Sequence, residues 1–352
     1  MIYAYGWISG VSIDKLVWRG VYVLRTYTPL HRYFVVLVSE CCHSVIPRKL
    51  SPMSLDLAGA ATLEIGRMPQ PVLTEYELGR LLFDLYDKKQ VEGLKISRLK
   101  KSVPDIGDFG SLLRALLSRG ILRKRRDFRG SVYNILGKTQ FTPEDILCSV
   151  DPFAYLSHLS AMAYHGLTNR ILTTIFYSTP QQTKWSSFAV LKMKSDLGEH
   201  LQAYRDGNLP RLTHIRFARI DKKPVHKYAS AHTGAFKIGK ERVLRVSTIG
   251  RTFLDMVRAA HLCGGIDHVI EVYEAHARQY EALIVEEIDR HGTLIDKARA
   301  GYVLDERCGI TGNATIEKWA TTVQRGGSRK LDPLSEYSSR YSARWCLSLN
   351  NS

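Results

Sequence analysis

The side chains of this sequence that are best suited to bind a partner are cations gathered between residues 95 and 129. This stretch holds eleven Lys or Arg against three Asp, so its net charge (11 − 3) is half of the chain's formal +16. Guanidinium and ammonium groups bind phosphate, and a local basic patch is typical of nucleic-acid-binding proteins. The concentration of charge therefore favours DNA as a partner over a general role in solubility.

Two histidines further along the chain could serve as metal ligands or as an acid and a base. Residues 152–165 are predicted to form one helix, capped by Asp151, on which Tyr155, His158 and His165 share one side. A metal site needs further ligands, and no third His, Cys or carboxylate stands at a helpful spacing. We therefore expect hydrogen-bonded structural histidines and no metal.

An acid-lysine run at residues 221–223 follows a predicted strand, 213–220, and is faintly similar to the strand end of metal-dependent nucleases. That chemistry needs a second acid to hold magnesium. The acids that could supply it stand in no recognisable turn: Asp196, Glu199 and Asp206. The sequence also lacks a phosphate-binding Gly-rich loop, GxSxG and HExxH. A surface loop is favoured, and we predict no catalytic centre and no cofactor.

A helix and a hairpin should position the cations of the basic stretch. Apolar residues recur at helical spacing from Phe109 to Leu117, with Asp108 as the expected cap and Gly120 as the end. Two strand-like runs follow, 121–124 and 132–136, and a basic turn joins them. A helix followed by a basic hairpin is similar to the recognition helix and wing of a winged helix-turn-helix. The alternative is an amphipathic helix and hairpin with a solvated charged tip.

Each cation then has an expected contact. Ser111, Arg114 and Ser118 are the base-reading candidates, and Arg114 is the best because a bidentate Arg to guanine is the commonest specific contact. The other cations are expected to touch phosphate or the minor groove, with a solvated role as the alternative. They are Arg123, Lys124, Arg125, Arg126 and Arg129 on the hairpin and Lys100 and Lys101 before the helix.

Two earlier helices complete the predicted DNA-binding domain. Thr74 and Glu77 form the T-x-x-E of a capping box that opens a helix to about Lys88. A shorter helix is expected over 95–103, followed by a turn. Helix, helix, turn, helix and wing then follow one another across residues 72–137, which is the order of a winged helix-turn-helix.

The cysteines and the apolar windows indicate in which cellular compartment the protein is expected. The six cysteines show no CxxC spacing, which favours reduced thiols in a cytoplasm over a zinc site or a disulfide framework. The most apolar window, 22–38, is interrupted by Arg25, Pro29, His31 and Arg32, so we expect no membrane span. The first ten residues lack the features of a secretory signal. We predict a cytoplasmic protein with no membrane partner.

Two separated segments resemble one family. The run PFAYLSHLSAMAYHGLTNR, behind a predicted winged helix-turn-helix, resembles the AbiEi antitoxins of type IV toxin-antitoxin systems. The later run STIGRTFLDMVRAAHLCGGIDHVIEVYEA is similar to a second stretch of that family, and it puts Ser247, Arg251 and Asp255 at the family's cap, Arg and Asp positions. The chain departs from the pattern at Ile249 and Gly250, where the family usually has Pro-Glu. The resemblance covers residues 72–310.

The resemblance implies a two-part protein. Its N-terminal domain would bind inverted repeats in its own promoter and repress the operon. Its C-terminal domain would neutralise a nucleotidyltransferase-like toxin, AbiEii, without necessarily forming a stable complex, in phage defence by abortive infection. In this framework the candidates for antitoxin function are Tyr155, His158, His165, Arg251 and Asp255.

We therefore predict an α+β protein: a winged helix-turn-helix domain, then a mixed α/β antitoxin domain with a helical C-terminal part. Two or three domains are expected from 352 residues. Their predicted bounds are 1–67 (a poorly defined extension, with translation starting at Met68 as a hypothesis), 68–137 (DNA binding), 138–310 (antitoxin) and 311–352 (a partly disordered tail). Two alternatives stay open: a winged-helix regulator with a ligand-sensing or dimerisation domain, and a metal-dependent nuclease targeted by a winged helix.

Overall fold

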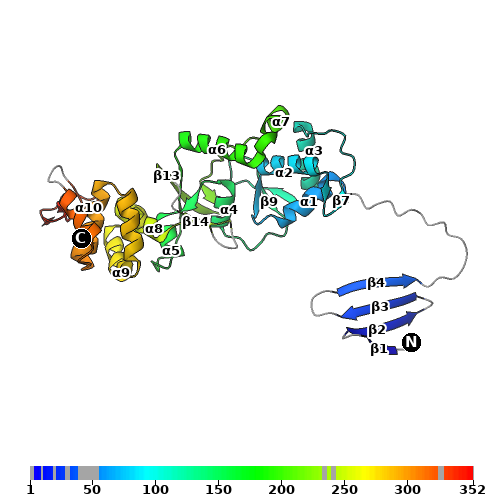
Figure 1. Cartoon of the computed structure of the whole chain (residues 1–352), viewed down its shortest axis with the longest axis horizontal. Coiled ribbons are helices and arrows are strands. Elements are labelled where there is room, and N and C mark those ends of the chain that lie inside the picture. The colour runs from blue at the N-terminus through cyan, green and yellow to red at the C-terminus, as the bar shows by residue number, and fades with distance from the viewer. Residues whose placement is uncertain are drawn as a thin grey trace, which may run out of the picture. The chain divides into compact units, whose positions relative to one another are not determined.

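Alternating β-branched and aromatic residues near the start of the chain form strands. The computed structural model describes strands at 4–8, 11–18, 21–27 and 32–38, and then residues 55–231, 236–238, 243–323 and 329–351. The chain divides into two compact units, Met1–Met53 and Ser54–Ser352. In the first unit, four strands pair antiparallel in chain order (Figure 1): β1 (Ala4–Ile8), β2 (Val11–Trp18), β3 (Val21–Tyr27) and β4 (Arg32–Val38).

The second unit begins with three helices and a small sheet around one core. Thr74 and Glu77 cap α2 reciprocally, as the sequence predicts. The leucines of α2 are buried in this core together with Leu112 and Leu116 of α3, whereas Leu117 at the end of the predicted apolar face of α3 is exposed. Strands β5, β9 and β8 pair antiparallel in that order. The elements are α1 (Leu57–Arg67), β5 (Val72–Thr74), α2 (Glu75–Lys88), β6 (Gln90–Val91), β7 (Leu94–Lys95), α3 (Ile106–Ser118), β8 (Leu122–Lys124) and β9 (Val132–Ile135).

Two predictions about this region are wrong. The extension was predicted to reach residue 67, but α1 buries Ala60, Ala61 and Ile65 in the same core as α2, so residues 57–67 belong to the folded unit. The helix predicted over 95–103 does not form. The backbone of residues 95–97 forms hydrogen bonds with Leu55 and Lys89 instead. Its amide and carbonyl groups are therefore not available for the hydrogen bonds of a helix, which join residues four apart. A chain that started at Met68 would lack α1.

The cap of α3 also differs by one turn from the prediction. Asp105, and not Asp108, is the N-cap, and Asp108 takes the reciprocal position three residues later. Both carboxylates therefore bond the backbone at the start of α3. The predicted end of the helix at Gly120 is close to the observed end at Ser118. Gly120 has a positive φ of 70°, a conformation that glycine adopts easily after a helix.

A six-stranded mixed sheet follows in the order β12-β13-β11-β10-β15-β14. It is covered by helices that Figure 1 shows around it. The elements are α4 (Pro143–Val150), β10 (Tyr155–Leu156), α5 (His158–Tyr164), β11 (Ile175–Pro180), α6 (Gln182–Leu197), α7 (Leu201–Asp206), β12 (Arg219–Ile220), β13 (Lys223–Ser230), β14 (Phe236–Ile238) and β15 (Arg245–Ser247).

The single helix predicted over 152–165 is wrong. Asp151 ends α4 instead of opening a new helix, and its buried carboxylate accepts from the Phe153 amide, Thr179 Oγ and Trp185 Nε1. The chain then crosses the sheet as β10 before α5 starts at His158. Two of these partners, Thr179 and Trp185, come from outside the segment and outweigh its local helix signals.

Helices α6 and α7 were not predicted, and they connect the two parts of the second unit. Met193, Leu197 and Tyr204 pack into the core of α1–α3, and Tyr76 Oη donates to Asp196 at 2.9 Å. Helix α2 packs closely against α7, since a Cβ on Gly79 of α2 would lie 2.5 Å from the hydroxyl of Tyr204 on α7. Residues on both sides of the predicted boundary at 137 therefore share one core.

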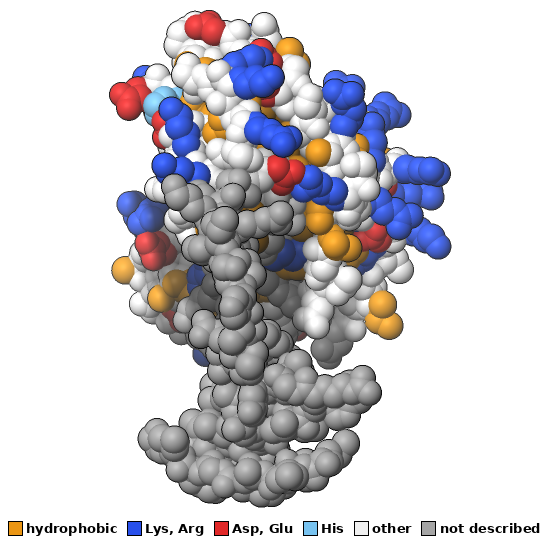
Figure 2. All heavy atoms as spheres, turned by 90° about the vertical axis from the view of Figure 1, so that its right-hand side faces the viewer, with side chains coloured by type: hydrophobic (Ala, Val, Ile, Leu, Met, Phe, Trp, Pro, Cys, Tyr) orange, Lys and Arg blue, Asp and Glu red, His pale blue; other side chains and the backbone are white. Residues whose placement is uncertain are grey.

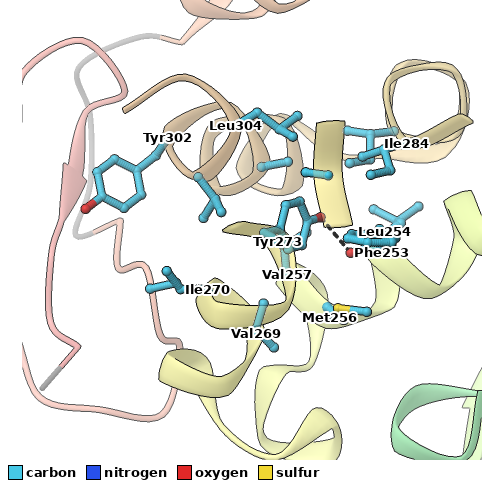
Figure 3. Close-up of a cluster of buried hydrophobic side chains, with 14 of the residues drawn as sticks. Phe253, Leu254, Met256, Val257, Val269, Ile270, Tyr273, Ile284, Tyr302 and Leu304 are labelled. Atoms are coloured by element: carbon cyan, nitrogen blue, oxygen red, sulfur yellow. Dashed lines mark hydrogen bonds between the residues drawn. The ribbon is translucent and has the colours of Figure 1, made fainter. Parts of the chain in front are cut away.

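The C-terminal part is helical, as predicted, and has the largest core. In Figure 3, Phe253 and Leu254 of α8 lie against Tyr273 of α9, whose hydroxyl donates to the Phe253 carbonyl at 2.8 Å. The elements are α8 (Ile249–Arg258), a 3₁₀ turn (Ala260–Cys263), α9 (Ile266–His291), α10 (Leu294–Tyr302), a π-helical turn (Val303–Arg307), α11 (Ala314–Thr322), β16 (Tyr341–Ser342) and β17 (Leu347–Ser348).

The tail predicted as partly disordered over 311–352 has fixed structure in residues 329–351. Trp345 is fully buried, and its ring lies where a Cβ on Gly301 would be, so α10 accepts it only because residue 301 has no side chain. The strands β16 and β17 flank this contact. In the described part of the chain, no helix is both long enough and apolar enough to cross a membrane. The whole is an α+β architecture.

Candidate functional site

The outward face of α3 carries the three predicted base-reading residues. Ser111, Arg114 and Ser118 are exposed, while Leu112 and Leu116 on the opposite side are buried. Arg114 Nε donates to the Gly110 carbonyl at 3.2 Å, and its guanidinium forms no ion pair with any described residue. Its positive charge is therefore available to an outside partner.

The cations before and after α3 are used differently. Lys101 Nζ lies 2.5 Å from a carboxylate oxygen of Asp105 and 3.1 Å from one of Asp108. The ammonium lowers the pKa of Asp105 to about 2. Arg119, just after the helix, pairs with Asp56. Lys100 is exposed and unpaired within the described residues, so of the two predicted lysines only Lys100 has a free charge.

Four of the five predicted cations on the hairpin are also exposed. Arg123 and Lys124 lie on β8, and Arg126 and Arg129 lie in the turn before β9. None of the four has an ion pair among the residues that the structure describes. Figure 2 looks at the end of the second unit that carries α3, and Lys and Arg side chains outnumber acidic ones on the visible surface.

Arg125 differs from its neighbours. Its side chain is 8% exposed and lies 2.5 Å from Asp127 and 2.6 Å from Asp221, and it also donates to Asn134 at 2.9 Å. The expectation that Arg125 contacts DNA with a free guanidinium is therefore wrong in this structure. Its charge is neutralised, and its side chain holds the hairpin against the turn between β12 and β13.

The tip of the hairpin is packed against another segment and does not project alone. Phe128 and Phe217 stack edge to face with ring centroids 5.2 Å apart, and the Arg129 amide donates to the Arg216 carbonyl at 2.9 Å. These contacts fix the direction of the tip. They also place the exposed side chains of Arg126 and Arg129 on a rigid support, which favours binding because little side-chain and backbone entropy is left to lose.

A second group of candidates meets inside the protein. Arg251 and Asp255 of α8 form an ion pair at 2.9 Å with side chains only 2% and 1% exposed. Tyr155 on β10 and His158 at the start of α5 are also buried, and both interact electrostatically with this pair. The structure thus brings together four residues that two separate sequence segments supply.

The electrostatics of this buried polar cluster follow from burial. Desolvation lowers the pKa of His158 to about 4 and raises the pKa of the Tyr155 hydroxyl. Arg251 adds to the depression for His158, and Asp255 opposes it. His158 is therefore neutral at pH 7. Its backbone has a positive φ of 50°, which costs of order 1 to 3 kcal/mol and is more common at functional sites than elsewhere.

A chain of hydroxyls fixes one side of the His158 ring. Ser178 Oγ lies 2.8 Å from Ser157 Oγ, which lies 2.8 Å from His158 Nδ1. On the other side, His158 Nε2 has no hydrogen-bond partner among the described residues, and neither has Asp255 Oδ2. His165, the fifth candidate, instead contacts the Ser247 carbonyl through Nε2 at 2.7 Å and so joins α5 to β15.

Three of the residues considered for nuclease chemistry form ion pairs. Asp221 contacts Arg125, Lys223 contacts Glu144 at 2.8 Å, and Asp196 contacts Lys192. Within the described residues, no group of three or more His, Cys, Asp or Glu could hold a metal ion. The four cysteines in this part, Cys148, Cys263, Cys308 and Cys346, are free thiols; Cys41 and Cys42 lie outside it.

The structure therefore offers two candidate sites of different character. One is an exposed basic surface on α3 and the β8–β9 hairpin, and the other is the buried polar cluster of Tyr155, His158, Arg251 and Asp255. Sequence spacing located the first. The second needed the fold, although the paired Arg251 and Asp255, four residues apart, were visible as a signal. In comparisons with known proteins, no protein-family model and no curated protein matches the chain, so the family resemblance stays a prediction from its residues.

Proposed function

We propose that this chain binds double-stranded DNA through α3 and the β8–β9 hairpin, acting as a winged helix-turn-helix. The proposal is supported by the order α1, β5, α2, α3, β8, β9 and by the three-stranded sheet β5-β9-β8. In such a domain the third helix enters the major groove and the hairpin touches the neighbouring backbone.

One observation carries the proposal. On α3 and the hairpin, five cations stand on rigid elements with no carboxylate partner among the described residues: Arg114, Arg123, Lys124, Arg126 and Arg129. Unpaired cations release counterions when they meet phosphates, which is the main source of affinity for DNA. The exposed polar face of α3 can then add base contacts through Arg114.

The test compares Arg114→Ala with the native chain on its own promoter DNA and on unrelated DNA. Loss of a bidentate base contact should weaken promoter binding by about 1 to 3 kcal/mol and leave non-specific binding nearly unchanged. Arg290→Ala is the control, because Arg290 is also an exposed arginine but lies on α9, and its removal should change neither affinity. Equal binding of promoter and unrelated DNA by the native chain would contradict sequence-specific recognition.

We further propose that the protein is a cytoplasmic autorepressor and AbiEi-like antitoxin that neutralises an AbiEii-like nucleotidyltransferase toxin. The resemblance of 152–170 and 247–275 supports this, and so does the meeting of Tyr155, His158, Arg251 and Asp255 in one cluster. In this proposal the cluster fixes α5 on α8 and thereby shapes the antitoxin surface.

The antitoxin proposal is tested by co-expression with the neighbouring nucleotidyltransferase gene. Native protein should restore growth, and Asp255→Asn, which keeps the size of the side chain but removes the charge, should restore it less at equal soluble protein level. Arg290→Ala again serves as the control. Absence of such a gene beside this one, or failure of the native chain to restore growth, would contradict the proposal while leaving DNA binding open.

A further inference from the structure

A cavity lies between α6 and the segment that follows α7. Its volume is about 650 Å³, within the size range of small-molecule sites. One wall is α6, which contributes Trp185 and Met193, and the other is the segment 211–216. Neither the predicted DNA contacts nor the buried polar cluster contributes a residue to it.

The rim of this cavity carries three arginines whose guanidinium groups have no partner in the described part of the chain. Arg205, Arg211 and Arg216 are exposed, and none forms an ion pair or a side-chain hydrogen bond with any residue of the described ranges. Most arginines of the C-terminal helices, by contrast, are paired, as Arg258 is with Asp296. Three unpaired cations around one concave surface create a positive potential that attracts anions into it.

One carboxylate close to the cavity, that of Asp151, is already used by other partners. Asp151 lies behind the cavity wall, 4.0 Å from His214 Nε2, but it is buried and accepts hydrogen bonds from Trp185 Nε1, Thr179 and the Phe153 amide. It therefore fixes Trp185 and positions His214 at the cavity. The ring centroids of Trp185 and His214 are 5.1 Å apart.

The rest of the lining is apolar, with a few hydroxyl and amide groups. Ala189, Met193 and Leu212 supply the apolar surface, and Ser186 and Gln182 supply hydrogen-bonding groups beside it. A ligand that fits both halves has an anionic end for the arginines and a flat or apolar body for α6. Guanidinium groups are well suited to phosphate because they can donate two parallel hydrogen bonds to it.

We propose that this cavity binds a phosphate ester of nucleotide size, with the phosphate between Arg205, Arg211 and Arg216 and the base against α6. The same chemistry could come from a free nucleotide or from a nucleotide within a DNA strand. The proposal does not depend on α3 contacting DNA.

The test measures binding to the full chain by calorimetry, with AMP, ADP, adenosine and inorganic phosphate as probes. AMP or ADP should bind, and adenosine, which lacks the phosphate, should bind at least tenfold more weakly. Arg211→Ala with Arg216→Ala should weaken nucleotide binding at least tenfold. The matched control is Arg219→Ala, because Arg219 is an exposed arginine on β12 that has no ion pair with a described residue and does not line the cavity.

A second variant keeps the proposal open to contradiction if the double variant folds poorly. Ser186→Trp, at an exposed position on α6, should fill the cavity while all three arginines are retained, and it should abolish nucleotide binding at an unchanged melting temperature. If only a single-stranded oligonucleotide binds, and binding requires Arg211 and Arg216, the phosphate ester comes from a strand. If nucleotides and oligonucleotides bind the native, double and Ser186→Trp chains equally, or bind none of them, the proposal is wrong.

Discussion

The arginines at the two ends of the second unit have opposite roles. In the C-terminal helices they hold the structure together: Arg251 pairs with Asp255, Arg258 with Asp296, and Arg307 with Glu274. On α3 and the hairpin, Arg114 and Arg126 have no such partner among the described residues. The net charge of a segment therefore overstates what it can offer to DNA, because only unpaired cations on the surface can neutralise phosphates.

The two kinds of arginine also differ in what they contribute to stability. An exposed cation costs little to keep or to remove. A buried ion pair is different, since removal of one partner leaves the other as an uncompensated charge in a low-dielectric interior. Arg125 shows that both kinds occur within one hairpin, because it is tied to Asp127 and Asp221 while Arg126 beside it is exposed.

The largest expected effect comes from breaking the buried pair of α8. Arg251→Ala should lower the free energy of unfolding by about 3 to 5 kcal/mol, because Asp255 would stay buried without its cation. Thermal or urea unfolding measures this. Arg290→Ala, which breaks an exposed pair with Glu286 on α9, should cost less than about 1 kcal/mol.

A double variant makes this prediction sharper. Arg251→Met with Asp255→Leu removes both charges and should recover much of the stability lost in Arg251→Ala. Equal losses in Arg251→Ala and Arg290→Ala would remove the distinction between buried and exposed arginines in this protein.

A smaller effect is expected from acid, through His158. The pKa of His158 is about 4 in the folded protein and 6.5 without burial, as in the unfolded chain. Between these pH values the unfolded chain therefore takes up a proton that the folded chain does not. Stability should fall as the pH falls from about 6.5 to about 4, by at most about 1.4 kcal/mol per pH unit, and should not fall further below pH 4 on this account.

Unfolding at pH 7.5 and pH 5 measures this loss. His158→Gln should reduce the dependence on pH without removing it, because burial also lowers the pKa of His165 and His214. An unchanged pH dependence in His158→Gln would mean that the histidine is not held neutral in the folded protein.

The smallest change in stability, but a clear change in DNA binding, is expected on the hairpin. Arg126→Ala with Arg129→Ala should alter stability by less than about 0.5 kcal/mol, weaken binding to all DNA sequences and reduce the slope of log affinity against log salt by about 2. Arg125→Ala should mainly lower stability, since Asp127 and Asp221 would lose their shared cation. A larger loss of salt dependence in Arg125→Ala than in the double variant would contradict the division of roles.

Local signals in the sequence predicted the elements whose stability is local. The capping box of Thr74 and Glu77 lies within one helical turn, and the apolar period of α3 lies within 13 residues, so both could be recognised without the fold. The helix predicted over 95–103 failed because its backbone pairs with Leu55 and Lys89. Short-range propensity is weak beside such tertiary partners.

By itself, then, the sequence determined where cations gather, where α2 and α3 form, and that the chain is an α+β protein. The tertiary structure decided which cations are free, because the partner of Arg125 at position 221 is 96 residues away. It also placed Tyr155 and His158 beside Arg251 and Asp255, and buried Trp345 against Gly301. Contacts between distant residues form only when the whole core is assembled, so no local pattern announces them.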